Sequence, residues 1–116
     1  MKLVAKIFLK DRQNLVFGPG RMELLKATEA LGSLHKAAQA MGMSYRWAWG
    51  RLKNAEKALG VPLLTQEGAP GRGKAKILSD EAHELLEWYS EMEKKAEDLL
   101  LESSRKCPGF LKMEQL

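Results

Sequence analysis

Residues 31–60 have the sequence LGSLHKAAQAMGMSYRWAWGRLKNAEKALG, which predicts two short helices joined by a tight turn and thereby decides the fold. Ser33 and Ser44 each stand just before a helical pattern, where a side-chain oxygen can accept hydrogen bonds from free backbone N–H groups. Gly42 lies between the two patterns and supplies the positive φ that a sharp turn between helices requires. The alanines of the first helix allow the second helix to pack closely against it.

The second of these helices separates an apolar face from a basic one. The predicted core face recurs at helical spacing and consists of Ala48, Leu52, Ala55 and Leu59. The outer faces include four positive charges and consist of Arg46, Trp47, Gly50, Arg51, Lys53, Asn54 and Lys57. This pattern predicts a helix-turn-helix that binds DNA, because a recognition helix presents its N-terminal residues to base edges in the major groove. The alternative is a small helical domain whose basic face contacts no nucleic acid.

Several side chains of these two helices are candidates for DNA contacts. Arg46 has three interpretations that the sequence leaves open: a bidentate contact to guanine, a phosphate contact, or a solvated charge. Trp49 adjoins the core face and is expected to pack against the first helix, whereas Trp47 lies further round and either packs or contacts a base. The predicted DNA-binding residues are Ser33, Ser44, Tyr45, Arg46, Trp47, Arg51 and Asn54, together with Arg72 and Lys74 from the loop described below.

The charge of the chain is divided unevenly along its 116 residues, a length that suits one domain. Residues 1–79 hold 14 Lys and Arg against 5 Asp and Glu, and residues 80–116 hold 5 against 10, so the charges are +9 and −5. The basic part is expected to bind a polyanion with release of counterions. Cys107 is the single cysteine, and no apolar run approaches the roughly 18 residues of a membrane span, so we expect a cytoplasmic protein without a membrane partner.

Short strands are predicted on both sides of the helices. Residues 2–10 alternate apolar and basic side chains and predict a half-buried strand, and residues 15–17 predict a returning strand that completes an N-terminal β-hairpin. Residues 21–31 predict an amphipathic first helix that Gly32 ends. Residues 62–65 and 75–78 predict a second hairpin, or wing, whose glycine-rich tip suits a phosphate backbone or a minor groove. The alternatives for this tip are a basic surface loop and a glycine-rich cradle for a nucleotide phosphate.

A long helix is predicted from residue 80 to about residue 103, with Ser79 as its cap. Its apolar positions follow one another at intervals of four and three, as in a coiled-coil seam, and are Leu78, Ala82, Leu85, Tyr89, Met92, Ala96 and Leu99. Such a seam predicts a homodimer, and the alternative is a helix that packs back on its own domain. The expected organisation is a winged helix-turn-helix domain at residues 1–79, a dimerisation helix at residues 80–103 and a C-terminal tail at residues 104–116.

The segments GPGRMELLKA, GSLHKAAQAMGMSYRWAW and KAKILS resemble the N-terminal domain of ModE-type regulators, which are close to LysR-type winged helix-turn-helix domains. The resemblance covers roughly residues 2–100. It implies a dimeric transcription factor that places two recognition helices in successive major grooves of an inverted repeat. By motif position it implies DNA contacts from Ser44, Tyr45, Arg46 and Arg51, with Arg72 and Lys74 on the wing.

The chain also departs from this family. Members that sense molybdate have C-terminal β-barrel modules for which 116 residues leave no room, so no oxyanion or other small-molecule effector is expected on this chain. Trp47 occupies a position where a small or polar residue is common, and the wing tip is poorer in glycine than is usual. We therefore expect a sequence preference different from that of relatives.

Together these features predict a mainly α (α+β) fold, a winged helix-turn-helix with an N-terminal β-hairpin and a long C-terminal dimerisation helix. The predicted function is sequence-specific regulation of transcription at an inverted repeat, without catalysis or a cofactor. His35 and His83 are far apart in the pattern, so neither a metal site nor a catalytic triad is predicted. The alternatives are a protein-interaction adaptor, an architectural DNA-binding module without operator specificity, and an oxyanion-responsive regulator that binds a ligand at the dimer interface or at a helix N-terminus.

Overall fold

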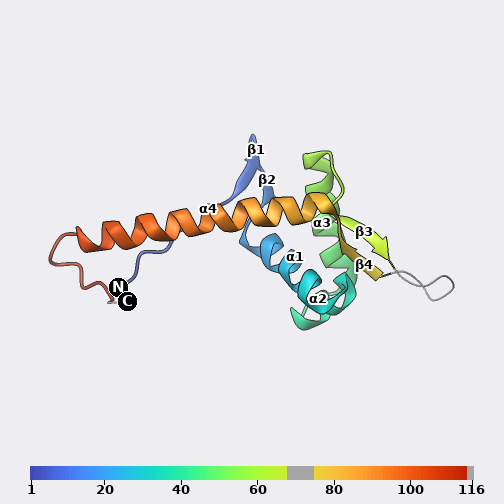
Figure 1. Cartoon of the computed structure of the whole chain (residues 1–116), viewed down its shortest axis with the longest axis horizontal. Helices are drawn as coiled ribbons and strands as arrows, with labels where there is room; N and C mark the ends of the chain where they lie inside the picture. Colours follow the sequence, from blue (N-terminus) through green and yellow to red (C-terminus); the bar gives the residue numbers. More distant parts are fainter. Residues whose placement is uncertain (68–74, 115–116) are drawn as a thin grey trace.

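The computed structural model describes residues 1–67 and 75–114 and contains four helices and two small antiparallel hairpins within them (Figure 1). The elements in chain order are β1 (Leu9–Asp11), β2 (Asn14–Phe17), α1 (Pro19–Leu31), α2 (Leu34–Ala40), α3 (Tyr45–Leu59), β3 (Leu64–Glu67), β4 (Ala75–Leu78) and α4 (Asp80–Arg105). This arrangement is the predicted winged helix-turn-helix architecture. The molecule measures 64 × 30 × 22 Å because part of α4 projects from the body. Its radius of gyration is 17.5 Å, whereas a compact chain of this length has about 13 Å.

The helix ends follow the predicted caps. Ser33 Oγ accepts a hydrogen bond from the Lys36 N–H, and Ser44 Oγ accepts one from the Trp47 N–H, each at 3.1 Å. Gly42 has a φ of 69° in the turn between α2 and α3. These local signals mark where α2 begins, where the chain turns and where α3 begins.

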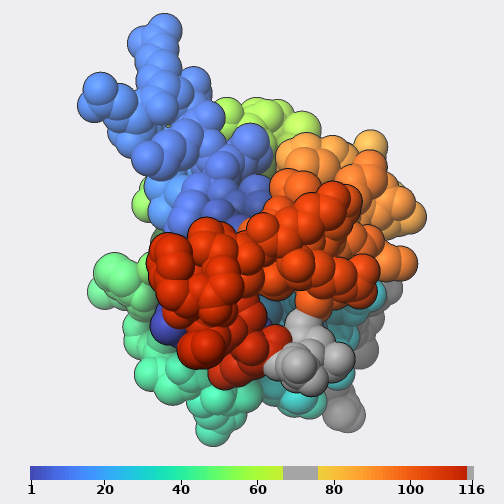
Figure 2. Space-filling model, turned by 90° about the vertical axis from the view of Figure 1, so that its left-hand side faces the viewer, coloured from blue at the N-terminus to red at the C-terminus, as the bar shows by residue number. Residues whose placement is uncertain are grey.

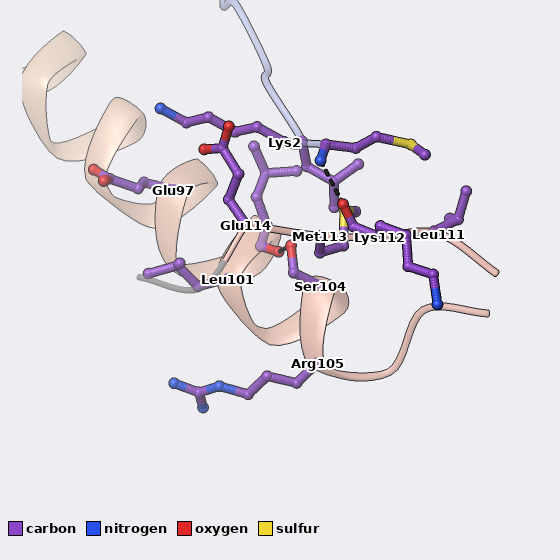
Figure 3. Close-up of a pocket in the computed structure, with 12 residues that line it drawn as sticks. Lys2, Glu97, Leu101, Ser104, Arg105, Leu111, Lys112, Met113 and Glu114 are labelled. Carbon is purple, nitrogen blue, oxygen red and sulfur yellow. Dashed lines mark hydrogen bonds between the residues drawn. The ribbon is translucent and has the colours of Figure 1, made fainter. Parts of the chain in front are cut away.

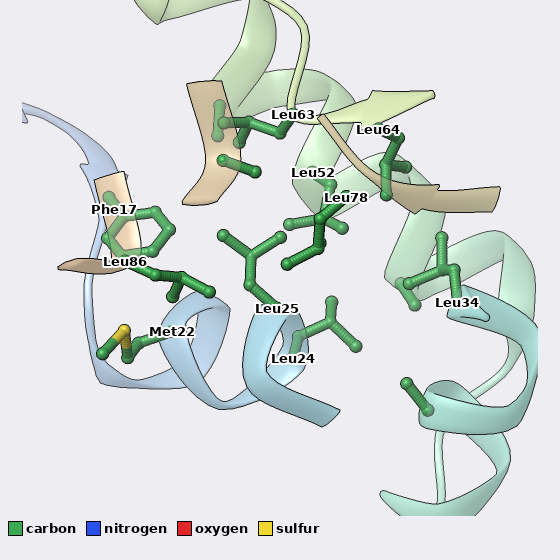
Figure 4. Packing of buried hydrophobic residues seen from close by; sticks show 14 of the residues in the cluster. Phe17, Met22, Leu24, Leu25, Leu34, Leu52, Leu63, Leu64, Leu78 and Leu86 are labelled. Carbon is green, nitrogen blue, oxygen red and sulfur yellow. The ribbon is translucent and has the colours of Figure 1, made fainter. Parts of the chain in front are cut away.

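The hydrophobic core contains side chains from every helix and from β2, β3 and β4 (Figure 4). Phe17 of β2 and Tyr89 of α4 are fully buried and meet edge to face, with ring centroids 5.2 Å apart. The Tyr89 hydroxyl donates to the backbone carbonyl oxygen of Ile7. Each fully buried large apolar side chain contributes about 1.5–3 kcal/mol, so this contact fastens the beginning of α4 to the domain.

The predicted strand at residues 2–10 is wrong over most of its length, because β1 includes only Leu9–Asp11. A strand needs a partner for its backbone N–H and C=O groups. The last register pair joins Leu9 to Phe17, beyond which the returning chain enters α1 at Pro19. Residues 1–8 therefore have no neighbouring strand and run beside α4 instead (Figure 1). Of the alternating apolar residues, Ile7 and Leu9 pack against the core while Leu3 is exposed.

Smaller differences concern element ends. The helix α1 begins two residues before its predicted start, since Pro19 is well suited to the first helical turn. The strand β3 begins at Leu64 rather than residue 62, and α4 continues to Arg105 rather than residue 103. The Ser79 Oγ both caps α4, by accepting from Ala82 N–H at 3.0 Å, and donates to the Pro62 carbonyl oxygen at 2.6 Å.

The two ends of the described chain meet at the far end of α4. The Met1 amino group donates to the Lys112 carbonyl oxygen (Figure 3), and the Glu114 N–H donates to the Met1 carbonyl oxygen at 2.7 Å. A half-open cavity of about 650 Å³ lies between residues 1–3, the last turns of α4 and the tail. Figure 2, a view from this end, shows the tail and the end of α4 in front of the body.

The predicted dimer seam divides into two parts that have different neighbours. Leu78 belongs to β4, and Leu78, Ala82 and Tyr89 are buried in the core of their own domain, so these three are corrected from dimer contacts to core residues. Beyond Tyr89 the seam loses its cover: Met92 and Ala96 are half-buried, and Leu99 is 62% exposed. We call residues 80–89 the proximal half of α4 and residues 90–105 the distal half. The core thus includes side chains on both sides of residue 79.

Candidate nucleic-acid interface

The recognition helix candidate, α3, rests on the body through one face. Ala48, Leu52 and Ala55 are buried against the core, as their spacing predicts. At the start of α3, the Tyr45 ring lies 5.8 Å from the ring of His35 in α2. The opposite face of α3 is exposed and displays Arg46, Trp47, Asn54 and Lys57, and the Trp47 side chain is 60% exposed.

One flank of α3 holds the base of the β3–β4 hairpin through Glu56. Its Oε2 accepts hydrogen bonds from the N–H groups of Leu63 at 2.7 Å and Leu64 at 3.0 Å, and its Oε1 lies 2.9 Å from Lys53 Nζ. Burial favours a higher pKa for Glu56, but the hydrogen bond from Lys53, the two backbone N–H groups and the Lys53 charge together lower that pKa. A carboxylate therefore sets the position of the wing relative to α3.

This contact alters the charge that α3 presents. Lys53 is paired with Glu56 and its Nζ also lies 5.5 Å from the centre of the Trp49 ring. Trp49 is 39% exposed and is absent from the core cluster, and its expected packing against the first helix stays a prediction. The cations of this face that form no ion pair within residues 1–67 and 75–114 are Arg46, Arg51 and Lys57.

The other flank of α3 is contacted by Arg21 of α1, an arginine that the sequence pattern did not single out. The Arg51 guanidinium lies 5.9 Å from the centre of the Trp47 ring, and the Arg51 carbonyl oxygen accepts a hydrogen bond from Arg21 Nε at 3.1 Å. Burial first, and then the charge of Arg51, lowers the pKa of Arg21. Helical periodicity could not reveal the contact between Arg21 and α3, because the two residues that form it are thirty positions apart in the chain.

The remaining predicted DNA contacts have different surroundings. Ser33 is nearly buried, with its hydroxyl engaged in capping α2, whereas the Ser44 cap at the start of α3 is exposed. Arg72 and Lys74 lie outside the described residues. The structure thus brings Ser44, Tyr45, Arg46, Trp47, Arg51 and Asn54 together on α3.

Among residues 1–67 and 75–114, no group of three or more His, Cys, Asp and Glu residues is suited to hold a metal ion. No described helix combines the length and apolar character needed to cross a membrane.

A helix pair with a following hairpin and a long helix defines the class of winged-helix DNA-binding domains. Within this class, residues 20–73 match the family described as "Bacterial regulatory helix-turn-helix protein, lysR family". This part of the chain is therefore similar to a LysR-type helix-turn-helix domain, as the sequence motifs implied.

Solved structures support the same fold. One is a crystal structure of the BenM DNA-binding domain in complex with benA site 1 DNA, with a TM-score of 0.56, 18% identity, and coverage of 78% of this chain and 96% of that one. Another is ArgP from Mycobacterium tuberculosis, with a TM-score of 0.52, 21% identity, and coverage of 74% and 30%. At these identities the likeness concerns the fold.

Curated relatives extend the match beyond the helix pair. The chain is 33% identical over 89 residues to the transcriptional regulator ModE of Haemophilus influenzae, covering 77% of this chain and 35% of the relative. It is 28% identical over 83 residues to the molybdenum-pterin-binding protein MopB of Rhodobacter capsulatus, covering 72% and 31%. The chain thus spans about a third of the length of these relatives and is homologous to them over that part.

Proposed function

We propose that the chain is a sequence-specific DNA-binding regulator of transcription that reads one half of an inverted repeat with each copy of a homodimer. The observation that supports this most strongly is the exposed, basic outer face of α3, held on a LysR-type helix-turn-helix scaffold. A recognition helix of this kind places its first turns against base edges in the major groove. The description of ModE as a transcriptional regulator and of the matched family as bacterial regulatory proteins agrees with this function.

Within α3 we assign base contacts to the first turn and phosphate contacts to the remainder. Tyr45, Arg46 and Trp47 occupy the first turn, and Arg46 has the length and planar donors for a bidentate contact to guanine. Ser44, Arg51 and Asn54 lie close to the same surface and are proposed as backbone or base-edge contacts. Arg72 and Lys74 are proposed as phosphate contacts from the wing, and Ser33 as a contact near the start of α2.

The second part of the proposal concerns dimerisation through the distal half of α4. Half-buried Met92 and Ala96 and exposed Leu99 continue the seam beyond the body of the molecule. The longest extent of the molecule is 64 Å because this half of α4 projects from the body (Figure 1). A second copy that packs along Met92, Ala96 and Leu99, and also touches Leu85 in the proximal half, would cover this surface and set the distance between two recognition helices.

Selection of bound fragments from the source genome, at about 0.15 M salt to reduce nonspecific electrostatic binding, tests the function. The proposal predicts enrichment of an inverted repeat. A bound pool without a motif would instead indicate an architectural module, and a lack of binding would indicate an adaptor; either result contradicts the proposal.

Substitution of Arg46 then tests the assignment of base contacts. If Arg46 contacts guanine, Arg46→Ala should weaken binding by about 1–3 kcal/mol and relax the preference at one base pair of each half-site. Lys94→Ala removes an equal charge from the distal half of α4, which projects away from α3 (Figure 1), and should leave the preference unchanged. Uniform weakening across sequences by Arg46→Ala would reassign the residue to a phosphate.

A further inference from the structure

Arg21 and Arg51 bring two guanidinium groups to one flank of α3. Arg21 Nε donates to the Arg51 carbonyl oxygen at 3.1 Å. Arg51 Nη2 lies 3.2 Å from the position that a Cβ on Gly20 would occupy. The beginning of α1 and the middle of α3 therefore meet here, and the charge of Arg51 is near enough to act on Arg21.

No carboxylate balances this pair in the part of the chain that the structure describes. The ion pairs there join Lys53 to Glu56, His83 to Glu29 and Lys106 to Glu102. Arg21 is half-buried, so its charge has lost part of its hydration while facing the like charge of Arg51. An anion that neutralises both guanidinium groups at once stabilises such a pair most.

The location of the pair relative to α3 indicates which anion it would bind. Arg51 and Glu56 are five residues apart, which places them about 140° apart around a helix axis. Glu56 faces the base of the β3–β4 hairpin, so Arg51 lies on the other flank. A helix in the major groove lies between two phosphate backbones, since the groove is about 12 Å wide. The hairpin thus faces one backbone and the arginine pair faces the other.

We propose that Arg21 and Arg51 together bind one phosphate of the DNA backbone, on the side of α3 opposite the β3–β4 hairpin. The planar guanidinium group matches the phosphate oxygens in a bidentate arrangement, and the nearby Trp47 ring limits the freedom of the Arg51 side chain. The inference rests on the proposed DNA binding and adds Arg21, which lies outside the recognition helix. A contact of this type fixes the position of α3 in the groove and reads no base.

The salt dependence of binding tests the proposal, because each phosphate contact contributes about 0.9 to the slope of log K against log salt concentration. Binding of the 116-residue chain to a duplex with the selected site is measured between about 50 and 300 mM salt. Arg21→Gln retains a donor for the Arg51 carbonyl, and it should lower the slope by about one and weaken binding about 5- to 10-fold near 0.1 M salt. Arg21→Lys retains the charge and should retain the slope, as should the control Lys94→Gln.

A second measurement separates a phosphate contact from a purely structural role. Single phosphates of the duplex are replaced in turn by neutral methylphosphonate. The wild type should lose affinity at one position in each half-site where Arg21→Gln is insensitive. If Arg21→Gln keeps both the slope and the methylphosphonate profile of the wild type, Arg21 only supports α3 and the proposal is overturned. A wild type that binds no DNA would instead overturn the proposed function.

Discussion

The proximal and distal halves of α4 share one apolar spacing but have different surroundings. In the proximal half, Ala82 and Tyr89 are fully buried against the core of the domain, and Leu86 is buried nearby. In the distal half, Leu99 continues the same spacing and is 62% exposed. The comparison teaches that a heptad pattern reports an apolar face and not the identity of its partner, because a helix packed on its own domain and a helix packed on a second copy have the same period.

The largest expected effect is the loss of the Tyr89 side chain from the proximal half. Tyr89→Ala removes a ring packed on Phe17 and should lower the free energy of unfolding by about 3–5 kcal/mol. Tyr89→Phe keeps the ring and loses only the hydrogen bond to Ile7, at a cost of about 0.5–1.5 kcal/mol. Denaturant titration at low protein concentration measures both, with Leu99→Ala as the distal control. If Leu99→Ala lowered the free energy of unfolding as much as Tyr89→Ala does, the proposed difference between the two halves of α4 would be contradicted.

The next effect concerns the distal half and the association of two copies. Leu99→Glu places a charge in the proposed seam without a partner and should raise the dimer dissociation constant at least about 100-fold, or about 2.7 kcal/mol. Its monomer should unfold at the same denaturant concentration as the wild-type monomer, since Leu99 is exposed. Sedimentation equilibrium measures the association. Ser90→Glu adds the same charge on the opposite side of the helix and should leave the dimer intact; unchanged association in Leu99→Glu would remove the distal half from the interface.

A smaller effect is expected where α3 meets the hairpin that precedes α4. Glu56→Ala leaves the N–H groups of Leu63 and Leu64 without their acceptor and should cost about 1–3 kcal/mol. Because folding lowers the pKa of Glu56 below its ordinary value of 4.5, its stabilisation is present above that pH and is lost as the pH falls through the folded-state value. Unfolding curves from pH 7 to pH 3 should therefore be less pH-dependent for Glu56→Gln, and identical slopes would contradict this role.

The smallest effect is expected at the cap of α3. Ser44→Ala removes the acceptor for the Trp47 N–H and should cost about 1 kcal/mol, whereas Ser44→Asn restores a capping oxygen and most of the stability. Thermal unfolding measures both variants. Equal losses for the two would show that the hydroxyl has a role other than capping.

The sequence predicted correctly those features of the fold that depend on neighbouring residues in the chain. The caps at Ser33, Ser44 and Ser79 and the turn at Gly42 depend on neighbouring residues alone, and the structure confirms them. The strand at residues 2–10 was mostly wrong because alternation cannot supply a partner strand, and β2 pairs with only three residues.

The candidate site shows the same limit. The exposed face of α3 followed from helical spacing, and the structure confirms the exposure of Arg46, Trp47 and Asn54. Helical spacing did not reveal two contacts: the ion pair between Lys53 and Glu56, whose carboxylate also holds the hairpin, and the hydrogen bond between Arg21 and Arg51. Both contacts depend on how α3 packs against other elements. Charges that a helix displays in sequence are therefore an upper bound on the charges it offers to a ligand.

The most direct test of the account compares binding to a duplex with the complete selected repeat and to a duplex with one half of it. If the distal half of α4 pairs two copies, the wild type should bind the complete repeat as two chains and far more tightly than the half-site. Leu99→Glu should then bind both duplexes with nearly equal, weak affinity. One wild-type chain bound to the complete repeat, with the affinity of the half-site, would contradict the account.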